Sequence, residues 1–207
     1  MKIYDISRTL SPKVAVWPGD QPFEHTWTMQ INQGASVNVS AIKLTVHGGT
    51  HADAPLHYLK EGKTIVELPL EKFIGPATVI EIRDSDRIKI EHLQILDFTK
   101  TRRLLFKTNA SFLDDTVWDN DFVYLDTDAA EFLGKHKIEL IGIDTPSVDP
   151  MTSKTLNTHK MLARYGIVNL ENLKLAQVSP GDYQLIAFPL KLEGIDASPI
   201  RAVLIGA

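Results

Sequence analysis

Short runs of apolar residues, separated by turn residues, are the main pattern along this chain. One of them, residues 78–82, alternates apolar and polar positions, and the others are mostly apolar. Runs of this length are typical of strands, and continuous apolar ones are typical of strands buried on both faces. The further runs are residues 103–107, 122–125, 138–143, 185–190 and 200–205. The pattern predicts a protein in which strands dominate.

Two segments between these runs carry the features of helices. Asp128 and Glu131 have the spacing of an N-cap residue and its partner at N3, and apolar residues follow them. Residues 153–165 are predicted to form a second helix, with Ser153 as the N-cap and Gly166 just past the end. We therefore expect an α/β or α+β fold: one domain, residues 1–207, with a mixed β-sheet or barrel-like core and flanking helices.

Another strand is predicted just before a cluster of histidines. Positions 37, 39 and 41 are apolar, and then positions 42, 44 and 46 are apolar, one residue out of phase. A β-bulge near Ala41 would explain the shift, and the strand would then run into His47. Two adjacent glycines after His47 disfavour a helix, and Pro55 biases Ala54 toward an extended conformation. The histidine cluster is therefore expected in an extended or looping segment at the end of a strand.

Composition narrows the classes of function. The chain has 22 Lys and Arg against 26 Asp and Glu, a net charge of −4, which lacks the basic footprint that nucleic-acid binding requires. It has no cysteine, so disulfides, thiolate metal sites and thiol catalysis are excluded. Neither a signal-peptide pattern nor an apolar stretch of the ~20 residues needed to span a membrane is present. We expect a cytoplasmic protein without membrane or nucleic-acid partners, acting on a small molecule.

The histidine cluster has the composition of a metal site. His47, His51, Asp53 and His57 all occupy odd positions, so in an extended chain their side chains would share one face. Three imidazoles and a carboxylate suit Zn²⁺, Mn²⁺ or Fe²⁺. Thr50 is small, and its hydroxyl could hydrogen-bond a side chain that itself binds the metal. The alternative, ordinary surface or core histidines, does not explain three His and one Asp within 11 residues framed by Gly-Gly and Pro.

Two later residues are candidates to complete the coordination. His159 falls on the side of the predicted helix that should face inward, and Glu171 lies among the apolar residues of positions 168–173. A buried carboxylate needs a cation or another partner. Each has an ordinary alternative, because His159 could be a hydrogen-bonded core histidine and Glu171 a solvated loop acid.

At these residues the chain resembles the metal-dependent cyclase-like amidohydrolases, whose signature reads H-x-G-T-H-x-D-x-P-x-H. Every specified position is present in residues 47–57. Within that family the chain looks most similar to the bacterial kynurenine formamidases, or arylformamidases, through segments spread over nearly the whole length. These segments are residues 4–7, 17–23, 37–39, 54–58, 142–150, 153–156 and 196–203.

The resemblance implies a compact fold of the swivelling β/β/α kind, a homodimer or larger homo-oligomer, and two zinc ions per subunit. It implies zinc-dependent hydrolysis of N-formyl-L-kynurenine to L-kynurenine and formate, a step of tryptophan degradation. The residues that match the family's first zinc site are His47, His51 and Asp53. Asp53 would bridge to a second zinc held by His159 and Glu171, His57 would be the catalytic acid/base, and Trp17 would line the substrate pocket.

Three other readings of the same residues stay open. A related enzyme that opens a cyclic amide of the isatin type, or a cyclase, would use the same metal site. A non-haem iron oxygenase needs only two His and one carboxylate, which would leave the remaining candidates surplus. A protein with purely structural zinc is disfavoured, because such sites are closed and usually rich in cysteine.

Overall fold

A nine-stranded mixed sheet is the centre of the protein. The computed structural model describes residues 1–206. The strands are β1 (Lys2–Asp5), β2 (Glu24–Met29), β3 (Val39–Lys43), β4 (His51–Asp53), β5 (Ile74–Glu81), β6 (Arg87–Ile88), β7 (Arg103–Lys107), β8 (Tyr124–Leu125), β9 (Leu140–Ile143), β10 (Val168–Glu171), β11 (Gly181–Ile186), β12 (Ala197–Pro199) and β13 (Val203–Gly206). The α-helices are α1 (Ile90–Leu93), α2 (Thr127–Lys135) and α3 (Asn157–Arg164). The order in the large sheet is β1-β13-β11-β5-β7-β9-β10-β4-β12.

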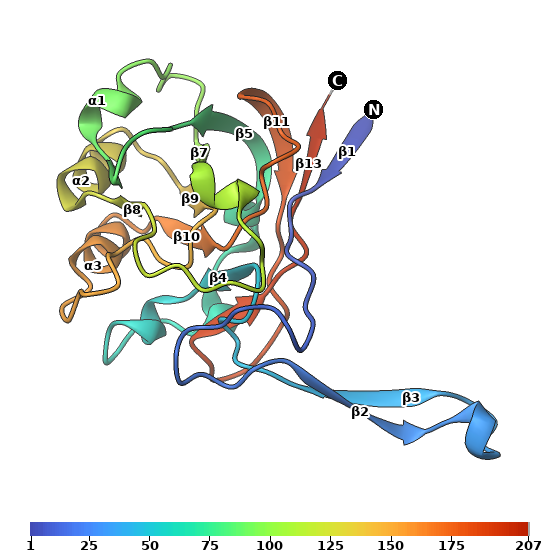
Figure 1. Cartoon of the computed structure of the whole chain (residues 1–207). Coiled ribbons are helices and arrows are strands. Elements are labelled where there is room, and N and C mark those ends of the chain that lie inside the picture. Colours follow the sequence, from blue (N-terminus) through green and yellow to red (C-terminus); the bar gives the residue numbers. More distant parts are fainter. Residues whose placement is uncertain (207) are drawn as a thin grey trace.

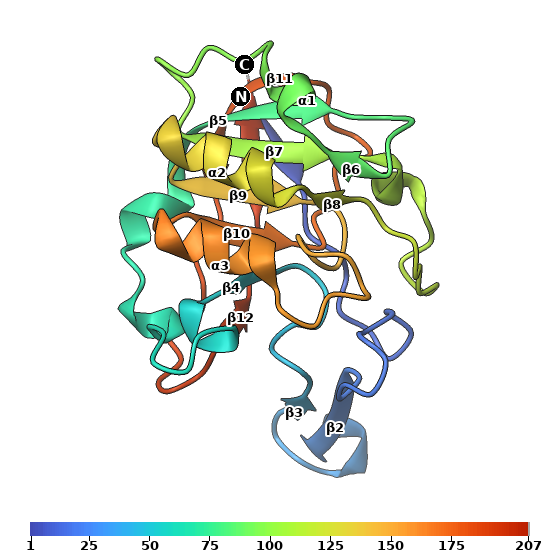
Figure 2. The ribbon, with the colours of Figure 1, turned by 90° about the vertical axis from the view of Figure 1, so that its left-hand side faces the viewer.

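The middle of the sheet is parallel and the two ends are antiparallel. Strands β5, β7, β9 and β10 run in the same direction, and α1, α2 and α3 lie together over one face of them (Figure 2). The sheet curls so that β1, β13 and β11 turn away from these helices (Figure 1). The expected α/β class, with a mixed barrel-like sheet and flanking helices, is confirmed. Within residues 1–206 no helix is long and apolar enough to cross a membrane.

Each face of the sheet carries its own hydrophobic core, which explains the continuous apolar runs. In β7, Leu104 and Phe106 pack toward the helices, while Leu105 packs into the hollow of the curled sheet. In β9, Leu140 faces the hollow and Ile141 the helices. Because neither face of these strands meets water, period-two alternation is lost and nearly every position is apolar.

Two of the predicted strands are misplaced. The run 185–190 is mostly not a strand, because β11 ends at Ile186, and Phe188 and Leu190 are exposed. Of the run 122–125, only Tyr124 and Leu125 pair, and they do so in a separate two-stranded sheet with β6. Runs this short lack the length that would tell a paired strand from an extended loop. The runs at 78–82, 103–107, 138–143 and 200–205 fall on β5, β7, β9 and β13, with ends shifted by up to four residues.

Both predicted helices exist, but their N-termini differ. Helix α2 begins at Thr127, so Asp128 lies in its first turn and the predicted Asp128–Glu131 cap is wrong. Helix α3 begins four residues after Ser153, because Leu156 takes a left-handed conformation at φ 48°. The Ser153 hydroxyl instead accepts a hydrogen bond from the Leu156 N–H. Gly166, at φ +66°, follows the end of α3 as predicted.

An arm made of β2 and β3 projects from the body of the molecule (Figure 1). Among residues 1–206 the two strands pair only with each other, and all their residues are exposed. The predicted bulge at Ala41 is wrong: Ala41 pairs regularly with Thr26, and the irregularity lies in β2 between Trp27 and Met29. Strand β3 also ends at Lys43, so a turn rather than a strand leads into His47. An exposed ribbon needs no strict alternation, which is why its sequence misled the prediction.

Candidate active site

The histidine motif is distributed over three kinds of local structure. His47 lies in a turn, His51 and Asp53 lie in the buried strand β4, and His57 ends the 3-10 helix η2 (Pro55–His57). Strand β4 is antiparallel to β10, and the register places His51 opposite Glu171. The motif is therefore fixed to the central sheet at its middle and is looser at its two ends.

Four buried side chains meet where β4, β10 and α3 come together. His51 Nε2 lies 3.4 Å from Asp53 Oδ1 and 3.5 Å from Glu171 Oε2. From the opposite side, His159 Nε2 lies 3.4 Å from Asp53 Oδ2 and 3.3 Å from Glu171 Oε1. All four residues are at most 3% exposed. His159 faces inward as predicted, and Glu171 is a buried strand residue rather than a solvated loop acid.

The unpaired atoms of this cluster point to a cation. Within residues 1–206, His51 Nε2, His159 Nε2 and Asp53 Oδ1 are buried without a hydrogen-bond partner. The other ring nitrogens are engaged: His51 Nδ1 donates to the Gly49 carbonyl at 2.9 Å, and His159 Nδ1 donates to Asp149 Oδ2 at 2.7 Å. In the neutral form of each ring, Nε2 then turns a lone pair toward carboxylate oxygens, which is repulsive unless a proton or a metal ion lies between them. Imidazole with its outer N–H held in this way is the usual arrangement of a histidine metal ligand.

His47 joins the cluster from the less buried side. Its Nδ1 lies 3.1 Å from Asp53 Oδ1, and its Nε2 lies 2.9 Å from Asp196 Oδ2. Two groups of possible ligands thus share Asp53, one with His47 and His51 and the other with His159 and Glu171. A third group combines His47 with His57 and Asp196. The donor set fits a divalent metal ion, because neutral imidazoles and carboxylates suit zinc and similar metals.

The local electrostatics favour positive charge at this place. Burial opposes the charged form of His47, but the hydrogen bonds that it donates to Asp196 and Asp53 outweigh this effect and raise the His47 pKa to about 10. Burial likewise opposes the charged form of His51, but its contacts with Asp53 and Glu171 raise the His51 pKa to about 9. Burial opposes ionisation of Asp53, yet its histidine neighbours hold the pKa of that carboxyl well below its usual range. A field that retains protons this strongly also attracts a metal cation.

A cavity of about 450 Å³ opens over the cluster. Its lining includes His57 and Trp17, so the structure brings both to the same space as the buried histidines. Trp17 packs edge-to-face against Trp118, with ring centroids 5.3 Å apart. The volume lies within the usual range for small-molecule sites, and the indole rings offer a flat apolar wall.

Sequence reasoning missed three residues of this site or gave them no role. Asn169 donates through Nδ2 to Asp53 Oδ2 at 2.9 Å and to Glu171 Oε1 at 3.1 Å, so it holds the two carboxylates together. Its position two residues before Glu171 on a strand was the available signal. Asp149 holds His159, and Asp196 holds His47. Arg201, which follows Asp196 closely in the sequence, binds Asp5 instead.

Comparison with known families gives the site its context. The family model described as "Putative cyclase" matches residues 4–150, well over half of the chain. The chain belongs to the cyclase family. The family resemblance inferred from the histidine motif is confirmed.

Other proteins similar to this cyclase-family chain match it over nearly the whole length. A protein of Salinibacter ruber (strain DSM 13855 / M31) named kynurenine formamidase is 45% identical over 206 residues, which are 99% of this chain and 97% of the relative. The structure of a "predicted metal-dependent hydrolase" from Bacillus stearothermophilus has a TM-score of 0.84 at 33% identity, covering 98% of this chain and 97% of that one. Isatin hydrolase A from Labrenzia aggregata, bound to benzyl benzoate, has a TM-score of 0.85 at 25% identity, covering 100% and 94%.

Proposed function

We propose that this protein hydrolyses N-formyl-L-kynurenine to L-kynurenine and formate. The observation that carries the proposal is the buried cluster of His51, Asp53, His159 and Glu171, whose unpaired nitrogens and oxygen converge beneath a cavity walled by indole rings. The 45% identity to a relative named kynurenine formamidase supports this substrate over other amides. We further propose that residues 1–207 act as one catalytic domain in the cytoplasm.

Two zinc ions are the cofactor that the ligand groups support best. His47, His51 and Asp53 would hold one ion, and Asp53, His159 and Glu171 the other. A bound zinc ion polarises a carbonyl oxygen and makes water a stronger nucleophile near neutral pH. With these residues assigned to metal, His57 stays available for proton transfer.

The protein's own groups would bind the substrate and move one proton. Trp17 and Trp118 would pack against the aryl ring of the substrate. His57 would accept a proton from the attacking water at Nε2 and return it to the departing aniline nitrogen, the usual task of a general acid/base. Its Nδ1 is held 3.2 Å from Asp196 Oδ2, which leaves Nε2 as the transferring atom.

The test is an assay of metal-replete protein on N-formyl-L-kynurenine, with metal quantified in the same sample. We expect about two zinc ions per chain, loss of kynurenine formation after chelation, and recovery with Zn²⁺. Turnover that survives full removal of metal would contradict the mechanism. One iron per chain with substrate-dependent oxygen uptake would instead support an oxygenase.

A second candidate is hydrolysis of a cyclic amide of the isatin type. It is favoured by the isatin hydrolase A structure, which superimposes on the whole of this chain. The metal-ligand groups do not distinguish the two substrates, so the comparison belongs in the assay. We expect kcat/KM for N-formyl-L-kynurenine to exceed that for isatin, and the opposite ratio would favour the alternative.

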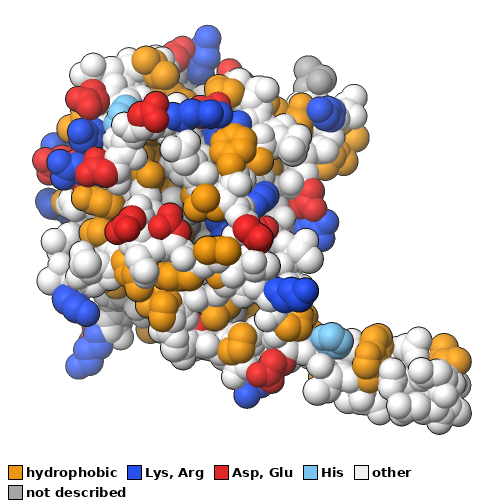
Figure 3. All heavy atoms as spheres, in the orientation of Figure 1, with side chains coloured by type: hydrophobic (Ala, Val, Ile, Leu, Met, Phe, Trp, Pro, Cys, Tyr) orange, Lys and Arg blue, Asp and Glu red, His pale blue; other side chains and the backbone are white. Residues whose placement is uncertain are grey.

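We also propose that the protein assembles with itself, as a homodimer or a larger homo-oligomer, through the β2–β3 arm. Trp27 is 51% exposed and Ile42 61% exposed, and apolar side chains gather on the arm (Figure 3). A two-stranded ribbon is marginally stable alone in water, so packing against a second copy would stabilise it. We expect the double variant Trp27→Ser with Ile42→Ser to sediment as a smaller species than the control Thr26→Ser. Equal sedimentation of the two would contradict a role for the arm.

A further inference from the structure

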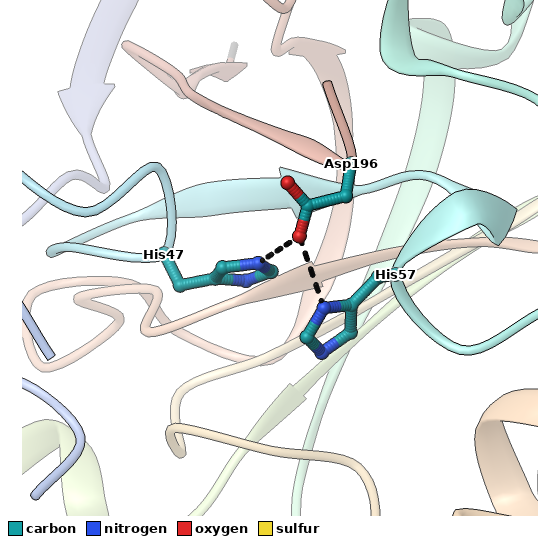
Figure 4. A group of neighbouring side chains, drawn as sticks. All are labelled: His47, His57 and Asp196. Atoms are coloured by element: carbon teal, nitrogen blue, oxygen red, sulfur yellow. Dashed lines mark hydrogen bonds and ion pairs between the residues drawn. The ribbon is translucent and has the colours of Figure 1, made fainter. Parts of the chain in front are cut away.

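A single carboxylate oxygen lies between two histidines at the mouth of the cavity (Figure 4). Asp196 Oδ2 is 2.9 Å from His47 Nε2 and 3.2 Å from His57 Nδ1. We propose that Asp196 is a positioning residue that fixes the tautomers of both imidazoles at once, coupling a metal ligand to the acid/base. The inference rests on the proposed function for its catalytic part, whereas its structural part stands on this geometry.

The backbone fixes Asp196 in place independently of its side chain. Asp196 directly precedes β12, whose pairing with β4 sets Ala197 opposite Asp53. The Asp196 carbonyl accepts a hydrogen bond from the Ala54 N–H at 2.8 Å, and the preceding carbonyl, of Ile195, accepts one from Ile65 at 3.0 Å. The carboxylate is thus anchored to the strand that carries two proposed metal ligands. Because the side chain is partly exposed, truncating it should leave the fold intact.

The tautomer argument follows from the chemistry of a carboxylate. An ionised carboxylate only accepts hydrogen bonds, so both ring nitrogens that face it must carry hydrogen. For His47, hydrogen on Nε2 leaves the lone pair on Nδ1, the atom 3.1 Å from Asp53 Oδ1 and directed toward the proposed metal. For His57, hydrogen on Nδ1 leaves Nε2 as the basic atom, and Nε2 points away from Asp196 (Figure 4). One oxygen therefore makes His47 a ligand and His57 a base.

The proton balance shows where Asp196 matters in the reaction. One water adds to the formyl carbon, the C–N bond breaks, and a proton from that water ends on the aniline nitrogen. His57 Nε2 carries the proton between the two, and the imidazolium formed in between is stabilised by the Asp196 carboxylate at Nδ1. Among residues 1–206, Asp196 gives the His57 ring its side-chain hydrogen bond, so without it nothing there holds Nε2 unprotonated and directed at the substrate. The loss should be largest when the departing nitrogen most needs a proton.

The experiment compares Asp196→Ala and Asp196→Asn with Glu193→Gln, which removes a charge from an exposed carboxylate in the same loop. The first readout needs no turnover: nitrogen-15 NMR of the histidine rings in zinc-loaded protein at about pH 8, above the ordinary imidazole pKa. We expect hydrogen on Nδ1 of His57 in the wild type and redistribution toward Nε2 in Asp196→Ala. Hydrogen on Nε2 of His57 in the wild type would overturn the proposal.

The second readout uses N-formylanilines with ring substituents that vary the basicity of the aniline. For Asp196→Ala we expect kcat about 10- to 100-fold lower with little change in KM, and a loss that grows with aniline basicity. Asp196→Asn retains an accepting oxygen and should recover part of the rate, while Glu193→Gln matches the wild type. A uniform loss across the anilines would mean a merely structural role, and loss of one metal equivalent would mean that Asp196 is itself a ligand. Wild-type protein inactive on every formamide would reject the proposed function, while the NMR result would still decide the tautomers.

Discussion

Asp149 offers the sharpest test of how this site is held together. Its carboxylate is buried and accepts three hydrogen bonds: Oδ1 from the Thr158 N–H at 3.1 Å, and Oδ2 from the His159 N–H at 3.0 Å and from His159 Nδ1 at 2.7 Å. It therefore caps the start of α3 and orients a proposed metal ligand together. In Asp149→Asn, one of the two oxygens becomes an NH₂ group, and every orientation of the amide sets that donor against an N–H.

The size of the effect follows from these contacts. The milder orientation of the amide loses the bond to Thr158 and leaves a buried donor unpaired, which costs about 1–3 kcal/mol of unfolding free energy. The two remaining hydrogen bonds, from the His159 N–H and from His159 Nδ1, lose their charge assistance. Loss of such a partner behind a histidine ligand typically weakens metal affinity about 10- to 100-fold, or about 1.4–2.7 kcal/mol.

Two measurements on the same variant check these numbers. Competition with a chelator gives zinc affinity, and urea unfolding of the metal-stripped protein gives the stability change without metal. The matched control is Asp182→Asn. Among residues 1–206, the Asp182 carboxylate accepts a side-chain hydrogen bond from the Thr78 hydroxyl alone. If Asp149→Asn binds zinc as tightly as that control does, the carboxylate does not orient His159 and the reasoning is refuted.

Three further predictions concern the site and its packing. His57→Ala should retain two zinc ions by elemental analysis while losing most formamidase turnover, and loss of one zinc would make His57 a ligand. Because the carboxylates raise the pKa of His47 to about 10 and of His51 to about 9, binding zinc must displace protons at pH 7. Apparent zinc affinity should therefore rise from pH 7 toward 10 and level off above, and a flat profile in chelator competition would contradict the assignment. Gly134→Ala should lower the melting temperature although alanine favours helices, because a Cβ there would overlap the ring of Tyr165; a higher melting temperature would show that the ring moves aside.

The sequence predicted the candidate residues of the buried cluster better than the bounds and pairing of the elements that carry them. The odd spacing of His51 and Asp53 placed both on one face of a strand. The apolar surroundings of Glu171 indicated that it could be a buried acid, although a solvated loop acid was the alternative. These features are local, so a short window of sequence contains them. The inward face of α3 was likewise readable from its period, although its first residue was not, because the left-handed Leu156 has no composition signal.

Contacts between distant segments could not be predicted in the same way. Asp196 lies 139 residues from His57 along the chain and reaches it only through the β12–β4 pairing. Arg201 was the nearer charge in sequence, but the antiparallel β1–β13 pair brings Asp5 to it instead. Both contacts depend on the pairing of distant strands, and which strands become neighbours cannot be predicted from the local pattern of a single sequence.

The division of labour around the cavity bears on how such enzymes diversify. His51, Asp53 and Glu171 belong to paired strands and His159 to a helix, whereas Trp17 and Trp118 come from loops outside regular structure. Loops tolerate substitution, insertion and deletion more readily than the elements that hold a fold together. Substitutions in the loops that carry Trp17 and Trp118 could therefore change the substrate-contacting surface repeatedly while the metal-ligand groups beneath it stay in place. Selection for activity on a new amide would act first on these loops. The unchanged metal-ligand residues would keep each intermediate protein catalytically active.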